Sequence, residues 1–360
     1  MINANNIIPE FSQANLEAVL NAYPLGEFQY RNLFPLEFNP TLNFASIEGA
    51  MGAKIMADIV AIGSKASRKG RDFVESIKGE IPKIEIARDK DEKDLLRIQQ
   101  LRNSVALYPQ NQAIKNQLID KIYEDVTFAV DGVNARLEWV AKQLISNGKF
   151  KTTVKNNAGG VANVEINFKI KTQNAKKNWF SAADADPIKE ITDLQSEARS
   201  KGYRYTTITL ERDVLDVLLA NPLVRQFVHG IPVNSSTVLP NITVEQLNAQ
   251  LQGKGLPTFR LVESFVAHEN KAGQVEATNG WEAGNILFSV SPILGTTQYT
   301  TTTEFNMNFP DVMSKAVKDD FILVKTFGHQ DPISISTKGT AFAVPVLNNT
   351  RQNLILKTKF

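Results

Sequence analysis

The longest regular hydrophobic pattern in the chain runs from Pro109 to Asn147. Apolar side chains recur there every three or four residues, which keeps them on one face of a helix. These side chains are Ile114, Leu118, Ile122, Val126, Val130, Val133, Leu137, Val140 and Leu144. Pro109 suits a first helical turn, and Asn147-Gly148 suits a helix end. At about 1.5 Å per residue the helix would reach about 60 Å, so we expect a spine that other elements lie over. Such length is more typical of an assembly subunit than of a compact catalytic domain.

A charged segment, residues 41–94, precedes this spine and is expected to form an extended hairpin. Residues 54–62 and 73–77 can each pair as strands. Between them lies Gly63 to Arg71, a tip rich in Lys and Arg with glycines for turning. Because an isolated two-stranded hairpin is only marginally stable in water, we expect this one to lie on another surface.

The first forty residues combine a short helical piece, Ser12 to Ala22, with prolines and aromatic side chains. The prolines prevent regular structure, and the aromatics are costly to expose to water. These residues are Pro24, Pro35, Pro40, Tyr23, Phe28, Tyr30, Phe34 and Phe38. Two interpretations stay open: a strap on its own domain, or an arm that lies over a neighbouring subunit.

The remaining patterns mix helices and strands without a sustained alternation of the two. Helices are expected at 91–105, 187–200, 211–219 and 244–251. Strands are expected at 82–88, 151–154, 164–170, 205–210, 259–266, 285–290, 298–305, 321–327, 340–346 and 353–359. The run Thr300 to Thr303 is assigned to a strand because its side chains are β-branched. The fold class is therefore α+β.

Composition narrows the class of protein. A chain of 360 residues can form two or three domains. Its 40 basic and 38 acidic residues leave a net charge of +2, which gives no electrostatic case for gripping nucleic acid. The absence of cysteine excludes disulfides and thiolate chemistry. No run of eighteen apolar residues predicts a membrane span, and the first residues lack the pattern of a secretory signal.

The sequence offers no residues for catalysis, for a cofactor or for a metal. Its three histidines, His229, His268 and His329, are isolated and lack the spacing of metal ligands. Gly-x-Ser-x-Gly is absent, and Gly253-Lys-Gly255 is only a fragment of a glycine-rich loop. A hydrolase or other enzyme with a noncontiguous site remains an alternative, which a deep pocket with perturbed ionisable groups would favour.

The carboxylate clusters are better explained by helix starts than by acid–base pairs. Acidic residues and lysines are interspersed from Asp89 to Asp94, as is typical of a solvent-exposed helix start. Asp184 and Asp186 precede a proline and are expected to be helix caps. Asp319-Asp320 forms another such cluster.

Three lysines of the hairpin raise one covalent possibility. Lys65, Lys69 and Lys78 could form an isopeptide bond with an asparagine of another subunit if a carboxylate acted as base. Nothing in the sequence marks an acceptor, so a solvated basic tip is favoured.

The order of elements, with one motif, resembles the major capsid proteins of tailed bacteriophages, whose fold is named after phage Hong Kong ninety-seven. The lambda-type branch, the phage major capsid protein E family, is the most similar. Its spine ends in an Arg-x-Glu-Trp/Met motif followed by Leu and Gly-Lys, which here reads Ala135-Arg-Leu-Glu-Trp-Val-Ala-Lys-Gln-Leu-Ile-Ser-Asn-Gly-Lys-Phe150. Trp179 to Ser181 and the region Pro345 to Leu356 also match. Residues 230–258 do not match, and the part after Gly328 is longer than the family pattern.

The resemblance implies a division of the chain into five parts. These are an N-terminal arm (1–40), an extended hairpin loop (41–94), a peripheral domain (95–185) with the spine helix 109–147, an axial domain (186–317), and strands returning to the peripheral domain (318–360).

The resemblance also implies a function: a major capsid protein that assembles into the icosahedral shell around double-stranded phage or prophage DNA. Its partners would be copies of itself in hexamers and pentamers, with scaffold, portal and decoration proteins as further candidates. It would enclose DNA without sequence-specific binding and have no membrane partner. Its location would be the virion capsid, assembled in the bacterial host cytoplasm. An encapsulin-like shell and a phage tail or head-completion protein are the alternatives.

The resemblance predicts that both projecting pieces, the arm and the hairpin, gain their order from adjoining copies of the chain. A closed symmetric array would bury surfaces that are unstable alone.

Overall fold

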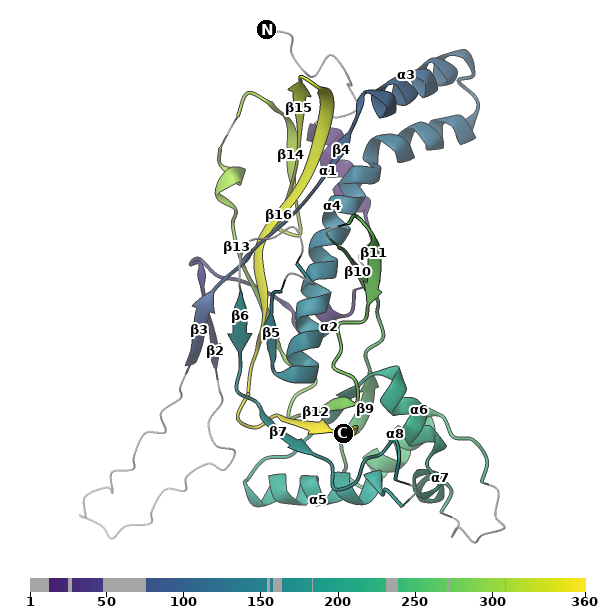
Figure 1. Ribbon diagram of the computed structural model, residues 1–360, viewed down its shortest axis with the longest axis vertical. Coiled ribbons are helices and arrows are strands. Elements are labelled where there is room, and N and C mark those ends of the chain that lie inside the picture. The colour runs from purple at the N-terminus through teal and green to yellow at the C-terminus, as the bar shows by residue number, and fades with distance from the viewer. Residues whose placement is uncertain are drawn as a thin grey trace, which may run out of the picture.

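The structure is a computed structural model that describes residues 13–24, 28–47, 76–153, 156–157, 164–182, 184–230, 239–270, 272–307 and 309–360. One long helix runs beside a sheet through most of its length, and a second group of strands and helices lies at the end of that helix (Figure 1). Within the described ranges, no helix is long and apolar enough to cross a membrane.

The helices confirm most of the predicted ones, with ends that agree within two residues except at the start of the spine. They are α1 (Gln13–Ala22), α2 (Tyr30–Leu33), α3 (Glu92–Leu107), α4 (Gln112–Asn147), α5 (Pro187–Ser200), α6 (Arg212–Ala220), α7 (Pro222–His229), α8 (Val244–Gly253) and the 3-10 helix η3 (Thr303–Phe305).

The strands form two larger sheets and three isolated pairs. The six-stranded sheet contains, in order, β1 (Leu36–Phe38), β13 (Gly295–Thr300), β16 (Ile333–Leu347), β15 (Ile322–Gln330) and β14 (Val312–Lys318), with β4 (Lys83–Lys90) also paired to β16. The five-stranded sheet is β7 (Lys171–Asn174), β17 (Leu354–Lys357), β12 (Asn285–Ser289), β8 (Thr207–Leu210) and β9 (Thr258–Leu261). The pairs are β2 (Asn43–Ile47) with β3 (Ser76–Glu80), β5 (Lys149–Lys151) with β6 (Glu165–Asn167), and β10 (Val266–Glu269) with β11 (Val275–Thr278).

The predicted spine is α4, but its start lies three residues later than expected. The side chain of Asn111 accepts hydrogen bonds from the backbone N–H groups of Ala113 and Ile114, so it caps the helix. Pro109 instead lies in the turn that joins α3 to α4. The expected end is confirmed, because Gly148 adopts φ +69° and its N–H donates to the Leu144 carbonyl.

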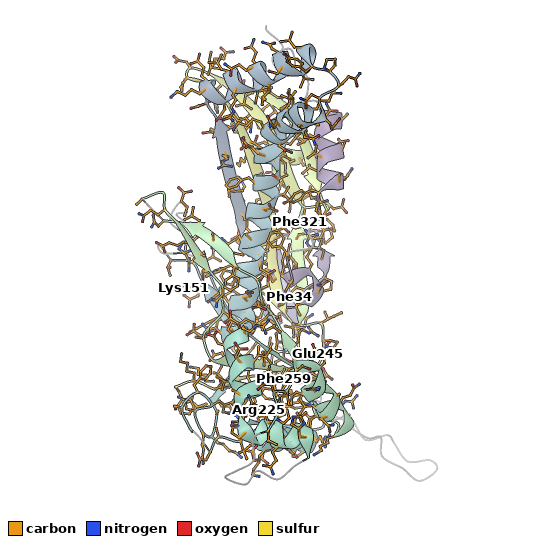
Figure 2. The ribbon with its side chains drawn as sticks, turned by 90° about the vertical axis from the view of Figure 1, so that its right-hand side faces the viewer. Phe34, Lys151, Arg225, Glu245, Phe259 and Phe321 are labelled. Carbon is orange, nitrogen blue, oxygen red and sulfur yellow. The ribbon has the colours of Figure 1, made fainter. Side chains whose placement is uncertain are left out.

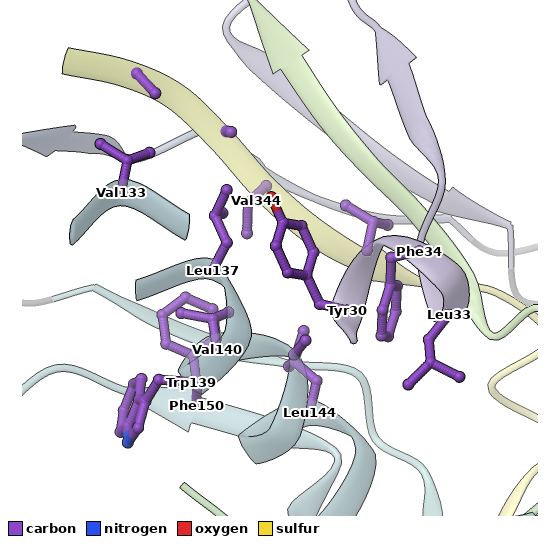
Figure 3. Close-up of a cluster of buried hydrophobic side chains, with 14 of the residues drawn as sticks. Tyr30, Leu33, Phe34, Val133, Leu137, Trp139, Val140, Leu144, Phe150 and Val344 are labelled. Carbon is purple, nitrogen blue, oxygen red and sulfur yellow. The ribbon is translucent and has the colours of Figure 1, made fainter. Parts of the chain in front are cut away.

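The main core lies between α4 and the six-stranded sheet. Val126, Val130, Val133 and Leu137 of the predicted stripe are fully buried there. Figure 3 shows Val133, Leu137, Val140 and Leu144 of α4 with Val344 of β16 and the aromatic residues of α2. β16 approaches α4 so closely that a Cβ on Gly339 would lie 2.6 Å from the Ala129 carbonyl oxygen.

A second core fills the space between the five-stranded sheet and helices α5 to α8. Ile191 of α5, Leu218 of α6, Val224 of α7 and Leu247 of α8 are all fully buried in this cluster. Ile208, in β8, is buried from both sides. The five-stranded sheet and its helices therefore have a core of their own.

Residues 13–24 and 28–47 decide between the two interpretations of the N-terminal segment. Leu16 and Leu20 of α1, with Tyr30 and Phe34, are buried in the main core of their own chain. Lys318 of β14 donates to the carbonyl oxygens of Leu20 and Tyr23. The described part of this segment is a strap on its own domain, so the prediction that it gains its order from adjoining copies is wrong for these residues.

Several strand predictions need correction. The predicted strand 259–266 is split into β9 and β10, because residues 262–265 leave the five-stranded sheet and cross to α4. The predicted strand 298–305 ends at Thr300, and the chain turns into η3 although Thr301 and Thr302 are β-branched. β14 and α7 were not predicted at all. The predicted strand 54–62 lies outside the described residues, and the hairpin's described base is formed by β2 and β3.

The two larger sheets are assembled from noncontiguous parts of the chain. β4, from the predicted loop range 41–94, and β13 and β14, from the predicted range 186–317, all lie in the six-stranded sheet. β15 and β16 return to that sheet as predicted for 318–360, but β17 lies in the five-stranded sheet.

Replacing Gly339 with alanine tests the close approach of β16 to α4. The new Cβ meets backbone atoms of Ala129, which cannot move aside as a flexible side chain would. We expect the free energy of unfolding in urea to fall by about 1–3 kcal/mol. Gly253→Ala is the matched control, because a Cβ there meets nothing within 4 Å. An equal, small effect of both substitutions would contradict the packing described here.

Candidate assembly surface

The spine-end motif forms the junction between the two sheet regions. Buried Glu138 accepts hydrogen bonds from the Tyr30 backbone N–H (2.8 Å) and from the Ser264 hydroxyl (2.6 Å). Lys142, one turn later, donates to the Ser264 carbonyl oxygen. The spine thus holds the strap and the segment between β9 and β10 with two adjacent side chains. Sequence reasoning identified the motif but not this role.

The charges around Lys142 are partly desolvated. Burial lowers the pKa of Lys142, and the charges of Glu138, Glu211 and Glu263 offset this only in part. Burial likewise raises the pKa of Glu211, which accepts a hydrogen bond from Asn279 at 2.5 Å. Lys142, together with Arg212, which pairs with Glu263 at 2.7 Å, offsets part of the charge of these three carboxylates.

The segment from Asn279 to Asn285 is fastened to the same end of α4. Gln143 donates to the Gly280 carbonyl oxygen at 2.7 Å, and the Ser146 hydroxyl accepts from the Glu282 N–H at 3.0 Å. Asn285 donates to the Ser146 carbonyl oxygen at 2.8 Å. Two of the connections to the five-stranded sheet, from β9 to β10 and from β11 to β12, therefore run over the last three turns of the spine.

The base of the predicted hairpin is anchored to the six-stranded sheet. Phe44 of β2 is buried in the main core. Gln298 of β13 bonds the Ala45 backbone with both ends of its amide, at 3.3 Å and 3.0 Å. The Ser46 hydroxyl donates to the Leu347 carbonyl oxygen. The described base of the hairpin is therefore fixed to the six-stranded sheet.

Of the three lysines of this hairpin, the structure describes one. Lys78 is exposed on β3, and Lys65 and Lys69 lie outside the described residues. The isopeptide possibility therefore gains no acceptor from the described part of the chain.

The face of the six-stranded sheet that points away from α4 carries a row of lysines. Lys315, Lys325 and Lys338 are direct neighbours on β14, β15 and β16. Like charges in this arrangement repel one another. The loop between β13 and β14 offsets part of this positive charge, because Glu304 pairs with Lys325, with Lys83 (3.2 Å) and with Lys338 (3.6 Å).

Glu304 is held in its ionised form. Burial alone would raise its pKa, but hydrogen bonds from Lys325 and Lys83 and the charge of Lys338 lower the pKa of Glu304 to about 2. Lys315 also holds the loop between β13 and β14, by donating to the carbonyl oxygens of Phe305 (2.8 Å) and Met307 (3.0 Å). We call these contacts of Glu304 and Lys315, which fasten the loop to the sheet, the latch.

The latched loop displays apolar side chains to solvent. Phe305, Met307 and Phe309 have 42%, 52% and 50% of their surface exposed. Large exposed apolar groups on an ordered loop are typical of a surface that a partner covers. Further exposed apolar side chains lie on other elements, namely Leu96, Leu107, Tyr108, Ile119, Phe265, Val275 and Ile293.

A groove of about 490 Å³ lies between β4 and the β10–β11 hairpin, with α4 as its floor. Ile84 and Ile86 of β4, Gly132 and Trp139 of α4, and Val266 of β10 line it. His268 also lines it, with its Nδ1 buried and without a hydrogen-bond partner in the described part of the protein. An apolar floor beside a strand suits a protein segment more than a reacting small molecule.

The histidines occupy separate places. His229 has its Nε2 3.4 Å from the Pro240 carbonyl oxygen, and His329 packs edge-on against Phe327. Among the described residues, no group of three potential ligands could hold a metal ion.

The predicted caps are confirmed in part. Asp186 caps α5 by accepting from the Lys189 N–H, and Asp91 caps α3 by accepting from the Asp94 N–H. Asp184 is not a cap, because its carboxylate pairs with Lys177. Asp319 and Asp320 form the turn between β14 and β15, with φ +51° and +65°.

The sequence matches the model of one protein family. A family model described as phage major capsid protein E matches residues 12–343. No curated protein matches the chain by sequence. The solved structure of a phage-related protein from Bordetella bronchiseptica RB50 is similar, with 11% identity, a TM-score of 0.54, and coverage of 96% of this chain and 97% of that one.

Two further solved structures share the fold. A proposed capsid protein of a prophage from E. coli CFT073 has 13% identity and a TM-score of 0.55, covering 96% and 98% of the two chains. The capsid protein of cyanophage A-1(L) has 12% identity and a TM-score of 0.50, covering 94% and 95%. These likenesses confirm the α+β, Hong Kong ninety-seven-like fold.

Replacing Glu304 with glutamine tests the latch. The carboxyl has a lowered pKa when folded, so its contribution to stability is present above about pH 5 and is lost as the pH falls toward 2. We expect Glu304→Gln to lower the free energy of unfolding at pH 7 by about 2 kcal/mol and to flatten its pH dependence in that window. Urea unfolding at pH 7 and pH 3 measures both. Glu165→Gln, at an exposed pair with Lys151, is the control and should change neither quantity; a wild-type pH profile in Glu304→Gln would contradict the latch.

Proposed function

The chain belongs to the phage major capsid protein E family and is a shell-forming capsid protein, and from this premise we propose that its shell is icosahedral and encloses double-stranded phage or prophage DNA. The observation that carries the proposal is the base of the hairpin, β2 and β3, which is anchored to a body whose described residues form two buried cores. A segment held at its base on a self-sufficient body is available to lie over a neighbouring copy.

The predicted division of the chain is kept as a proposal, with its regions defined by the sheets. The six-stranded sheet with α4 is the proposed peripheral domain, and the five-stranded sheet with α5 to α8 is the proposed axial domain. Separate cores support this division, because each region has its own buried cluster. The junction at Glu138 and Lys142 then sets the angle between the two domains in each subunit.

The proposed partners are copies of the chain in hexamers and pentamers. Scaffold, portal and decoration proteins are proposed as further partners. A net charge of +2 favours enclosure of DNA without sequence-specific contacts, since binding to phosphates needs many unpaired basic groups. The proposed location is the virion capsid after assembly in the host cytoplasm, and the family supports a structural role without catalysis.

Two other assemblies remain as outcomes of the test. An encapsulin-like protein would form closed shells without DNA packaging, and a tail or head-completion protein would form rings. The full chain expressed alone and viewed by electron microscopy distinguishes closed particles from rings and from free subunits.

Deletion of Gly63 to Arg71 tests the role of the hairpin. We expect a soluble monomer or capsomer that does not close into shells, because the deletion removes contacts with a neighbour and leaves both cores intact. Electron microscopy of the deletion variant beside the wild type measures this. Thermal unfolding monitored by circular dichroism is the control and should show a folded protein; normal particles from the deletion variant would count against the proposal.

A further inference from the structure

The outer edge of β4 is a strand edge without a partner in the described part of the chain. Phe342 of β16 pairs with Lys83 of β4 and with Thr300 of β13, so these two strands lie on opposite edges of β16. β4 pairs continuously with β16 over eight residue pairs and pairs with no other described strand. An unpaired edge of this length presents a row of free backbone groups to another strand.

β4 carries charged side chains, but two other common protections of such an edge, a proline and a bulge, are absent from it. Its sequence, Lys-Ile-Glu-Ile-Ala-Arg-Asp-Lys, contains no proline, and its register with β16 has no bulge. Side chains alternate between the two faces of the sheet. Ile84 and Ile86 point toward α4, because Ile86 contacts Gly132, while Lys83, Glu85, Ala87 and Asp89 point away from it.

The charge order of β4 is complementary to itself in the antiparallel register with its axis at Ile86. A two-fold axis perpendicular to the sheet pairs residues of the same face, so it must pass through one residue. An axis at Glu85 opposes two glutamates, one at Ala87 opposes Glu85 and Asp89, and one at Arg88 opposes two arginines. An axis at Ile84 opposes Lys83 to Glu85 twice, but only three residues of β4 then overlap. An axis at Ile86 overlaps seven residues and opposes Lys83 to Asp89, Ile84 to Arg88 and Glu85 to Ala87, each twice, with Ile86 facing Ile86. Opposite charges stabilise directly opposed positions, and like charges destabilise them.

The surroundings of β4 fit the same pairing. The groove on its α4 side has an apolar floor that would receive Ile86 of a second copy beside Ile86 of the first. In Figure 2, β4 lies on the outer border of the body, between α3 at the top and the pale green β10–β11 hairpin below. The two-fold axis exchanges these projections, so α3 of one copy faces the hairpin of the other. Each bears exposed apolar side chains, Leu96 on α3 and Val275 on β11.

We infer that two copies of this chain pair through β4, antiparallel about Ile86, and join their six-stranded sheets into one continuous sheet across a two-fold axis of the shell. This inference rests on the proposed function, because the shell brings the copies together. The contact is isologous, as two-fold symmetry requires. It uses the groove, the free edge and the charge order of one strand.

The main test compares two substitutions at position 87 that introduce opposite charges. Ala87 is exposed and would oppose Glu85 of the second copy twice. Ala87→Glu places four carboxylates together, and Ala87→Lys places each new cation opposite a carboxylate. We expect Ala87→Glu to lower the yield of closed shells about tenfold relative to the wild type, and Ala87→Lys to keep or increase it. Sedimentation and electron microscopy of the full chain measure the yield.

Within a single folded protomer we expect the opposite ranking: Ala87→Glu should be more stable than Ala87→Lys. Ala87 is the register partner of Lys338 within the chain. A glutamate at 87 therefore gains an intramolecular partner, and a lysine meets a like charge. Thermal unfolding of the unassembled protein controls for this effect. Equal shell yields, or a higher yield for Ala87→Glu, would overturn the inference.

Engineered cysteines test the register. The chain contains no cysteine, so Glu85→Cys with Ala87→Cys introduces its only thiols. In the register about Ile86 these thiols oppose each other between copies, and oxidation should give a covalent dimer on a non-reducing gel. The control, Lys83→Cys with Ala87→Cys, places no two thiols opposite each other in the register about Ile86 and should stay monomeric.

The two experiments separate the inference from the proposed function. Wild-type chains that form no shells would count against self-assembly by this chain alone, while the cysteine pair still reports whether concentrated protein pairs through β4. Shells that form normally without a covalent dimer from Glu85→Cys/Ala87→Cys would overturn the β4 contact and leave the proposed function standing.

Discussion

The burial of one face of α4 against β16 is the contact on which the rest of the structure depends. Gly339 lets the helix and the strand come together closely enough for backbone atoms to touch, and the valines of α4 fill the space on either side. The strap, the hairpin base and two connections to the five-stranded sheet, those before β10 and after β11, are attached to this pair of elements. A long helix in water is stabilised mainly by such packing, because its intrinsic propensity supplies little.

Polar contacts then fix positions that hydrophobic burial leaves undetermined. Hydrophobic packing is nondirectional, so it would allow the two sheet regions several relative angles. Glu138 and Lys142 bind particular backbone groups, and buried polar groups tolerate few geometries without losing a partner. The last turns of the spine therefore specify an angle, which a subunit needs if many copies are to close a shell.

The spine and the fold class were predictable from the sequence because their signals are local. Periodicity placed α4, and caps such as Asp91 and Asp186 placed the starts of α3 and α5. β14 was missed because Lys315 and Lys318 break its apolar pattern, and their partners come from the loop and the strap. The division of residues 259–266 was missed for the same reason: Ser264 leaves the sheet to meet α4. Contacts with residues that are distant in the sequence leave no periodic pattern from which a strand could be predicted.

The strap changes how the subunit must be understood. Its aromatic residues suggested dependence on neighbours, yet Tyr30 and Phe34 are buried in their own chain. A protomer that buries its own core can fold before it assembles. Its contacts with other copies must then come from groups that folding leaves unpaired. Backbone groups on a strand edge and apolar side chains on a latched loop are groups of this kind, because water hydrogen-bonds to the first and folding leaves the second exposed. Contacts between copies made from such groups are individually weak, and a closed array multiplies them without requiring any protomer to unfold.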